Sequence, residues 1–383
     1  MQRCPRTSAL PRIFAEGTPI IKACAASNLC LTGSVPAEPM PDNPRPNLDD
    51  RYSRQILFHG IGADGQKRLA GARIAIVGCG ATGSAVAALL ARSGVGTLRI
   101  VDRDYVEASN LQRQTLFEES DAAESLPKAI AAARRIAAFN SQIVVEPEVA
   151  DLTPANVDGL LAQTDLILDG TDNFETRYLV NDYAVRHARP WIYAAAVGSY
   201  GVTLNVIPGE TACLTCLFPE PPSGTVETCE TAGILNSAVN LVASMEATEA
   251  LKILVGARHR VRRTLLSFDV WHNDRAEISA GVPREACQTC GARNFVHLAG
   301  LGRPHITLCG RNSVQIHEQH RPIQFSQLSA ALEPHGRVRF NDYVLKFWRE
   351  PHEITLFPDG RAIIKGTTDT AVARSLYARF VGS

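Results

Sequence analysis

A glycine-rich turn between an apolar strand and a helix is the feature that most restricts how this chain can fold. Residues 72–77, ARIAIV, form an apolar run of strand length, and residues 84–94, SAVAALLARSG, repeat apolar side chains with helical spacing. Between them, GCGATG places glycines at Gly78, Gly80 and Gly83. Glycines in a strand-to-helix turn let backbone amides approach a phosphate. The stretch therefore predicts a strand–turn–helix unit with an anion site.

Strands and helices continue to alternate after this turn. The predicted strands are TLRIVD, QIVVEPEVA and DLILDG, and the predicted helices between them are SLPKAIAAARRIAAFN, with Ser125 as its N-cap, and PANVDGLLAQT. Such alternation predicts an α/β domain with a doubly wound, Rossmann-like parallel sheet, which we place at residues 48–294. Residues 295–383 contain short strands, a PDGR hairpin turn and a closing helix, and predict a small α+β domain.

Residues 1–47 are rich in proline, serine and alanine and show neither helical nor strand periodicity, so we expect a disordered leader. Four basic residues precede Met40. Two interpretations stay open: an organellar transit peptide, or translation from an upstream start codon with Met40 as the true beginning.

Charge and hydropathy exclude several classes of protein. The 383 residues carry a formal net charge of zero, which provides no general attraction to nucleic acid or to an acidic membrane. No apolar run approaches the length of a membrane-spanning helix. Ten cysteines in a chain of this length are too few for a disulfide scaffold. We therefore expect a cytoplasmic protein that binds neither nucleic acid nor membrane.

Four of the cysteines form two Cys-x-x-Cys pairs. ACLTCLF contains Cys213 and Cys216, and ACQTCGA contains Cys287 and Cys290. Four thiolates in two chelating pairs are the ligand set of a closed tetrahedral zinc site, which has no open position for a substrate. A redox centre would not need the second pair. The spacing predicts a structural Zn²⁺.

Charged residues around the glycine turn help to distinguish two possible ligands, NAD and a nucleoside triphosphate. Asp102 ends the strand after the glycine turn, where a carboxylate can accept hydrogen bonds from ribose hydroxyls. An NAD-dependent oxidoreductase would use the same geometry. Arg54, Arg113 and Lys128 supply the positive charge that a triphosphate needs, and Asp172 follows a strand end where it could hold Mg²⁺.

Six stretches resemble the ThiF and MoeB branch of the ubiquitin-activating enzyme superfamily, in unbroken order over about residues 48–292: RYSRQIL, GCGATGSAVA, GVGTLRIVDRDYVEASNLQRQTLF, PKA, LDGTDN and CETAG. The resemblance implies a homodimer that binds ATP and adenylylates the C-terminal Gly-Gly carboxylate of a ubiquitin-like sulfur carrier protein, with release of pyrophosphate. No general base is needed, because a carboxylate is already ionised at neutral pH.

The resemblance also implies a role for each matching residue. Arg54 reaches the triphosphate of the neighbouring subunit; Arg113 and Lys128 offset phosphate charge; Asn110 helps to orient the phosphates; Asp102 holds the ribose; Asp172 coordinates Mg²⁺; and the paired cysteines bind zinc that clips a late segment onto the main domain. Two departures from the family pattern are Gly170, where a cysteine is common, and Ala81-Thr82 inside the glycine turn. Neither departure removes a charged group.

Cys229, in VETCETAG, matches the cysteine that in ThiF-type members bonds covalently with the activated carrier. A helix predicted to start just after it would lower the pKa of this thiol, whereas Glu227 and Glu230 would oppose thiolate formation. MoeB-type members also hold a cysteine here and stop at the adenylate. Two mechanisms stay open: a Cys229 persulfide supplied by a cysteine desulfurase, or an adenylate that meets sulfur elsewhere.

The C-terminal domain bears on the choice of branch. FPDGRAIIKG resembles an extension on some thiamine-branch relatives, which favours a ThiS-like carrier in thiamine thiazole synthesis over the molybdopterin branch. Cys309 lies in this region without the spacing of a rhodanese loop, and we interpret it as structural. Two other classes remain: an NAD-dependent oxidoreductase, which would leave the cations without a purpose, and a non-catalytic scaffold that binds a carrier.

Overall fold

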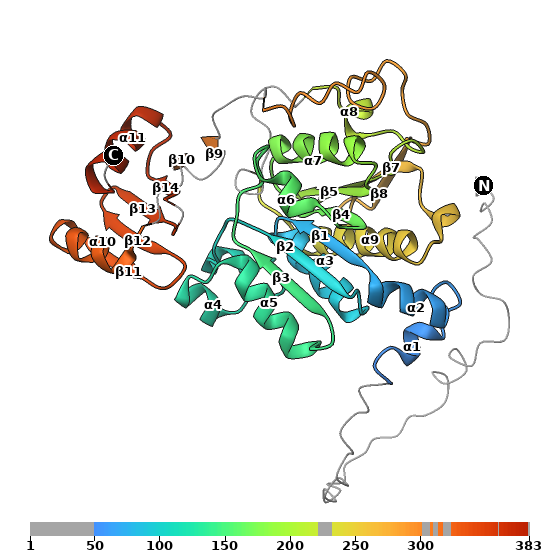
Figure 1. Ribbon diagram of the computed structural model, residues 1–383, viewed down its shortest axis with the longest axis horizontal. Helices are drawn as coiled ribbons and strands as arrows, with labels where there is room; N and C mark the ends of the chain where they lie inside the picture. The colour runs from blue at the N-terminus through green and yellow to red at the C-terminus, as the bar shows by residue number, and fades with distance from the viewer. Residues whose placement is uncertain are drawn as a thin grey trace, which may run out of the picture. The chain divides into compact units, whose positions relative to one another are not determined.

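Figure 1 shows a computed structural model of the chain, which describes residues 50–220, 232–300, 307–308, 313–316, 323–358 and 360–381. The expectations for the leader at residues 1–47, for Cys229 and for Cys309 fall outside the described residues. Among the helices that are described, none combines the length and the apolar character needed to cross a membrane.

An eight-stranded sheet forms the larger part of the fold, with strand order β3-β2-β1-β4-β5-β6-β7-β8. Its strands are β1 (Arg73–Val77), β2 (Thr97–Val101), β3 (Val144–Glu148), β4 (Leu166–Asp169), β5 (Trp191–Val197), β6 (Tyr200–Val206), β7 (Thr264–Asp269) and β8 (Asp274–Ser279). The first five are parallel, and β5 to β8 pair antiparallel. The strand order changes direction between β1 and β4, so the carboxyl ends of these two strands form the crevice where ligands bind in such sheets.

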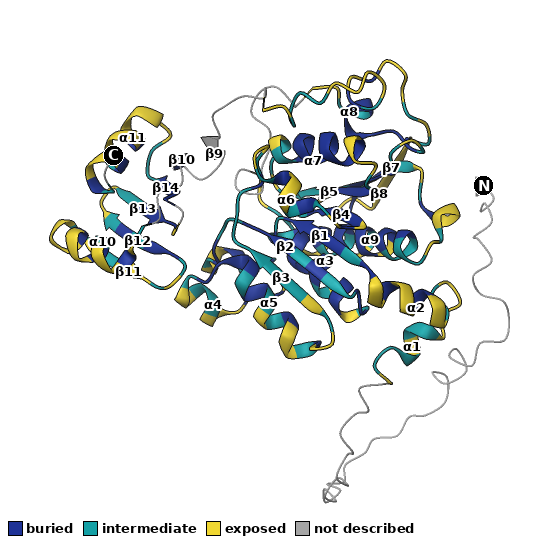
Figure 2. Ribbon diagram, viewed as in Figure 1, coloured by how far each residue is buried: buried dark blue, intermediate teal, exposed yellow. Residues whose placement is uncertain are grey.

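Helices cover both faces of this sheet, as its apolar strands require. Ile74 and Ile76 of β1 belong to an apolar cluster with the helices of one face, and Ala75 and Val77 belong to a second cluster with the helices of the other. The first face carries α3 (Ala81–Arg92), α5 (Lys128–Phe139) and α9 (Asn236–Leu254); the second carries α6 (Val157–Leu161) and α7 (Phe174–Arg186). The predicted doubly wound α/β fold is confirmed, and Figure 2 shows the buried central strands.

Shorter elements connect this framework: α1 (Ser53–Ile56), α2 (Gly62–Gly71), η3 (Ala108–Asn110), α4 (Glu119–Glu124), α8 (Leu214–Leu217) and η4 (Arg258–Arg260). The predicted N-cap at Ser125 is wrong. Ser125 ends α4 in the left-handed conformation, with φ 51°, and α5 begins at Lys128 after Pro127. Pro127 is extended, with ψ 136°, and its ring fixes φ, so the chain turns into the helix there.

A six-stranded antiparallel sheet lies near the C-terminus, with order β11-β12-β13-β14-β10-β9. We call it the C-terminal sheet. Its elements are β9 (Thr307–Leu308), β10 (Ser313–Ile316), α10 (Phe325–Leu332), η5 (Glu333–His335), β11 (Arg337–Phe340), β12 (Leu345–Arg349), β13 (His352–Leu356), β14 (Ala362–Lys365) and α11 (Thr370–Phe380). The helices and strands share an apolar cluster of their own, which includes Leu332, Phe347 and Tyr377. The domain boundary at residue 295 stays a prediction.

Candidate active site

The turns after β1 and β4 meet backbone to backbone at the carboxyl edge of the sheet. Gly78 has a φ of 87° and its amide donates to the carbonyl of Val101 at 2.8 Å. A Cβ atom at Gly83 or at Gly170 would collide with the carbonyl of Gly78. Glycine is thus required at Gly83 by a contact within the glycine turn and at Gly170 by the close approach of the β4 turn to it. In this chain the contact leaves no room for a side chain at Gly170, where the family pattern commonly has a cysteine.

Gly80 differs from its neighbours because space is open in front of it. A Cβ atom there would find no atom nearer than 3.8 Å. Gly80 precedes α3 and provides no side-chain cap, so the first backbone amides of the helix remain available to an anion. The partial positive charge at the start of a helix adds to the attraction. This end of α3 can hold a phosphate group.

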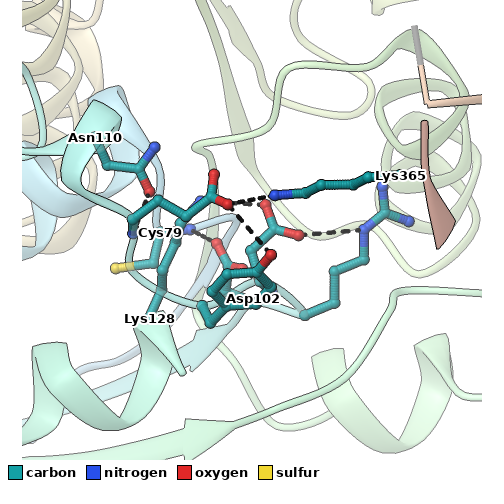
Figure 3. Close-up of polar contacts among 9 residues, drawn as sticks. Cys79, Asp102, Asn110, Lys128 and Lys365 are labelled. Atoms are coloured by element: carbon teal, nitrogen blue, oxygen red, sulfur yellow. Dashed lines mark hydrogen bonds and ion pairs between the residues drawn. The ribbon is translucent and has the colours of Figure 1, made fainter. Parts of the chain in front are cut away.

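Asp102 organises the glycine turn from the end of β2. Its carboxylate accepts hydrogen bonds from the amide of Cys79 at 2.5 Å and from the amide of Asp104 at 2.6 Å (Figure 3). Burial raises the pKa of Asp102, and the nearby Lys128 ammonium opposes that rise. The structure brings this carboxylate to the predicted site. Its assigned contact with a ribose stays a prediction.

Lys128 is the first residue of α5, and only 3% of it is exposed. Its ammonium lies 3.1 Å from a carboxylate oxygen of Asp104, and its backbone amide donates to the carbonyl of the same residue. Burial raises the pKa of Cys79 and of Asp102, and the nearby Lys128 ammonium opposes both rises. Lys128 therefore lies at the glycine turn, as predicted, with its charge directed into a buried edge of the sheet.

Asn110 and Arg113 lie on the connection between β2 and α5. The side-chain oxygen of Asn110 accepts a hydrogen bond from the amide of Glu107 at 3.1 Å, and the two residues form a capping box around η3. In the described part of the chain, the Asn110 side-chain NH₂ has no partner. Arg113 is half-buried and donates to the carbonyl of Ser109 at 2.8 Å. Both residues keep donors with which they could bind phosphate.

Asp172 is exposed in the turn after β4, on the same edge of the sheet. The described residues provide no hydrogen bond or ion pair to its carboxylate. Arg103, at the end of β2, is close enough for Asp172 to contribute to a raised pKa of that guanidinium, although burial opposes the rise. An accessible carboxylate beside a phosphate site is a suitable ligand for Mg²⁺. No described contact tests that role.

Three charged groups beneath this turn were not predicted from the sequence. Asp169 accepts from the Arg177 guanidinium at 2.9 Å, and Arg177 donates in turn to the carbonyl of Thr171 at 2.6 Å. Glu246 of α9 accepts from the amide of Asp169 at 3.1 Å, and burial raises its pKa well above the usual value. These side chains fix the backbone of the turn that carries Asp172. The available signals were an arginine one helical turn after Asn173 and a glutamate inside an apolar helix.

Arg54 is not brought together with the other predicted residues. Its helix α1 packs at the far ends of α3 and α5, where Gln55 donates to the carbonyl of Ser93 at 2.8 Å and Arg51 to that of Phe139 at 2.6 Å. Both helices start at the glycine turn edge and have 12 residues, a length of about 18 Å. Arg54 is exposed at that opposite end and does not reach the site of its own chain.

The four paired cysteines converge as predicted. The sulfur atoms of Cys213, Cys216, Cys287 and Cys290 all lie within 4.8 Å of one another. The separations are 3.6 Å for Cys213–Cys287, 3.3 Å for Cys216–Cys290 and 3.8 Å for Cys213–Cys216. A tetrahedron of sulfurs with Zn–S bonds of about 2.3 Å has edges of about 3.8 Å. The cluster therefore fits a structural zinc ion.

The cysteine thiols of the cluster influence one another's ionisation. A hydrogen bond to Cys216 and burial raise the pKa of Cys213, and burial raises that of Cys290 to about 12, whereas the hydrogen bond with Cys213 lowers the pKa of Cys216 to about 4. A zinc ion would oppose the two rises by stabilising the thiolates. A hydrogen-bonded pair of threonine hydroxyls, Thr215 and Thr289, lies 3.0 Å apart beside the cluster, and Thr289 donates to Asp182 of α7 at 3.2 Å. The late Cys-x-x-Cys segment is thus joined to the main sheet by polar contacts as well.

Comparison with known proteins places these features in a family. The model of the ThiF family matches residues 52–292. The sulfur carrier protein ThiS adenylyltransferase of Bacillus subtilis is 45% identical over 339 residues, which cover 88% of this chain and all of that protein. The adenylyltransferase and sulfurtransferase MOCS3 of Bos taurus is 37% identical over 323 residues, which cover 83% of this chain and 68% of that protein.

A solved structure agrees with the fold. Escherichia coli MccB, crystallised with ATP, superposes with a TM-score of 0.55 at 25% sequence identity, and the match covers 63% of this chain and 74% of that chain.

Proposed function

The chain belongs to the ThiF family, and we propose that it catalyses the ATP-dependent adenylylation of the C-terminal Gly-Gly carboxylate of a ubiquitin-like sulfur carrier protein. The Bacillus subtilis relative is named for ThiS and aligns over its full length. We therefore propose a ThiS-like carrier and a role in sulfur transfer for thiamine thiazole biosynthesis. The alternative, a MoeB-like activation of the molybdopterin synthase carrier, has the support of a more distant relative, MOCS3.

The observation that carries this proposal is the assembly of the glycine turn, Asp102 and Lys128 at one buried edge of the sheet. The start of α3 and the Lys128 ammonium can offset negative charge on a polyphosphate. The carrier carboxylate, already ionised, would attack the α-phosphate, and pyrophosphate would leave. Catalysis of this kind depends on positioning and on charge stabilisation and needs no protein base. An NAD-dependent oxidoreductase would have no use for Arg113 or Lys128.

Asp172 is our proposed ligand for Mg²⁺. Its carboxylate is exposed at the edge where the phosphates would lie, and its turn is fixed from below by the Asp169–Arg177 pair. When bound, the metal ion would neutralise charge on the leaving pyrophosphate.

We propose a homodimer, and the position of Arg54 supports this proposal. Because α1 packs at the end of the sheet opposite the glycine turn, Arg54 can reach a triphosphate only in the site of a neighbouring subunit. We propose that it does so, and that each site of the dimer is completed by the other chain.

Carrier-dependent exchange between ATP and labelled pyrophosphate tests the function. We expect the unaltered chain to catalyse exchange only with Mg²⁺ and carrier present. Asp172→Ala should lower the exchange rate by about 100-fold or more, because the metal ion loses its protein ligand. Asp64→Ala, which removes an exposed carboxylate on α2, is the matched control and should retain full activity. Undiminished exchange by Asp172→Ala would refute its role, and tight binding of NAD in place of ATP would refute the function.

We propose that Cys229 carries sulfur as a persulfide supplied by a cysteine desulfurase. Its outer sulfur would displace AMP from the carrier adenylate to form an acyl disulfide, and a second thiol would reduce that disulfide and release the carrier as a thiocarboxylate. Cys229→Ser should keep ATP–pyrophosphate exchange, because that reaction precedes sulfur transfer, and should abolish thiocarboxylate formation. Mass spectrometry of the carrier measures the product. A full thiocarboxylate yield from the variant would favour the mechanism that stops at the adenylate.

A further inference from the structure

The connection between β2 and α5 carries most of the predicted phosphate contacts. We call residues 104–128 the nucleotide segment, since Asn110, Arg113 and Lys128 all lie on it. Apart from η3 and α4 it contains no regular secondary structure. A segment of this kind depends on tertiary contacts for a defined shape. The C-terminal sheet supplies such contacts at both ends of the segment.

The first contact is an apolar cluster around Tyr105. Its ring is 4% exposed and packs with Val344, Phe357 and Ile363 of the C-terminal sheet. The Lys346 ammonium lies 3.8 Å from the centre of the ring, a cation–π distance. Burial raises the pKa of Tyr105 to about 12, so the phenol stays neutral and its hydroxyl donates to the Glu107 carboxylate at 3.2 Å.

The second contact is an ion pair between the sheet and the capping box of η3. The Lys365 ammonium lies 2.5 Å from a carboxylate oxygen of Glu107, and the two side chains are 25% and 26% exposed (Figure 3). Burial alone would lower the pKa of Lys365, but the Glu107 carboxylate raises it, so the lysine is charged. The amide of Glu107 donates to the side chain of Asn110, so a single hydrogen bond links the Lys365–Glu107 ion pair to a predicted phosphate-binding residue.

The third contact holds the other end of the segment. The Asn341 side chain, in the turn between β11 and β12, donates to the carbonyl of Glu124 at 2.7 Å. Its oxygen accepts from the amides of Tyr343 and Val344, which orients the amide group. The two ends of the segment also meet each other, because Val106 donates to the carbonyl of Leu126 at 2.8 Å. The backbone just before Lys128, where α5 starts, is thus held by these hydrogen bonds.

From these contacts we propose that the C-terminal sheet holds the nucleotide segment in its ATP-binding conformation, with Lys365 as the positioning residue that acts through Glu107 on Asn110. This inference rests on the proposed function, because ATP is the ligand being positioned. Lys365 itself does not contact the predicted phosphate groups. Its effect would appear in the affinity for ATP and not in the chemistry of the carrier.

Loss of the Lys365 charge would leave the Glu107 carboxylate partly buried beside a phenol. The capping box that orders η3 would lose its external support, and Asn110 would gain freedom to move. Misplacement of a contact residue by a fraction of an ångström weakens binding without removing any direct contact. We therefore expect a change in KM for ATP, whereas kcat and KM for the carrier should change little.

The experiment compares Lys365→Met, which keeps the aliphatic stem, with Lys365→Arg, which keeps the charge. In the full chain, Lys365→Met should raise KM for ATP in the exchange assay by about tenfold and weaken ATP binding in calorimetry equally. Lys365→Arg should restore both to within about twofold. Arg349→Met is the matched control, because it removes a cation that donates within the C-terminal part, to the carbonyl of His335 at 2.8 Å. It should leave KM for ATP unchanged.

The outcomes separate this inference from the proposed function. An unchanged KM for ATP in Lys365→Met, with exchange otherwise normal, would overturn the positioning role. The positioning role would also be overturned if Lys365→Met lowered kcat only in proportion to the folded fraction, as measured by circular dichroism. If the unaltered chain binds ATP but shows no exchange, the proposed function fails, and calorimetry on the same variants still decides the role of Lys365. No ATP binding by the unaltered chain would overturn both.

Discussion

The cysteine cluster differs in construction from the nucleotide edge, by which we mean the carboxyl edge of the large sheet with the glycine turn, the β4 turn and the nucleotide segment. Four side chains of one type, in two short motifs, already meet the distances of a tetrahedral metal site. The nucleotide edge combines three separate segments, and its predicted charged groups differ in burial and in position. Lys128 is buried beside a carboxylate, Asp172 is exposed, and Arg54 lies at the opposite end of the sheet.

This difference reflects what each site must do. A structural metal site contributes to folding, so its ligands are gathered in the folded chain. A site that binds and releases a nucleotide instead has a rigid backbone cradle and leaves some charges for the ligand or for a second subunit to complete. We therefore expect changes in the cluster to act on stability, and most changes at the edge to act on ATP.

The largest expected effect is loss of the metal. Cys287→Ser, or removal of zinc by a chelator, should lower the free energy of unfolding by about 5 kcal/mol or more, because metal binding is coupled to folding. Denaturant titration measures the loss, and elemental analysis should find one zinc per unaltered chain. Cys79→Ala, a buried cysteine outside the cluster, is the control and should retain the metal. A chain that is equally stable without zinc would contradict the structural role.

The next prediction is that alanine substitutions at two glycines of the same turn affect different properties, stability at one and ATP binding at the other. Gly83→Ala should lower the free energy of unfolding by about 3 kcal/mol, because its Cβ atom would collide with the carbonyl of Gly78. Gly80→Ala should change stability by less than about 1 kcal/mol, since the nearest atom is 3.8 Å away, yet raise KM for ATP by filling the space where a phosphate would approach. Equal losses of stability in both variants would contradict the inference that a side chain at Gly80 fits into open space.

Most of the fold could be predicted from local patterns. Short apolar runs such as residues 72–77 indicate strands buried on both faces, and their alternation with helical segments predicts a parallel sheet. The predicted zinc ligands were also local, because each motif places two thiols on one turn. The glycine turn and Lys128 were found because both stand at the start of a predicted helix.

What could not be predicted depended on contacts between distant segments. Gly170 is required only because another turn touches it. The ion pair of Lys365 with Glu107 joins residues 258 positions apart in the chain, so no local pattern indicates it. Glu246 is fully buried in α9, and its position is explained only by its contact with the amide of Asp169. Ser125 was assigned as an N-cap because serine favours that position, whereas Pro127 sets the true start of α5.

The smallest effect concerns the buried groups below the β4 turn. The raised pKa of Glu246 means that its stabilising contribution is complete below its unfolded value of about 4.5 and is lost as pH rises toward the folded value. The unaltered chain should therefore lose up to about 1.4 kcal/mol of stability per pH unit just above that range. Glu246→Gln mimics the protonated acid, still accepts from the amide of Asp169, and should make this slope shallower while zinc content stays unchanged. Denaturant titrations between pH 5 and 7 measure both slopes. Parallel slopes would mean that Glu246 is ionised in the folded chain and that the edge tolerates a buried charge.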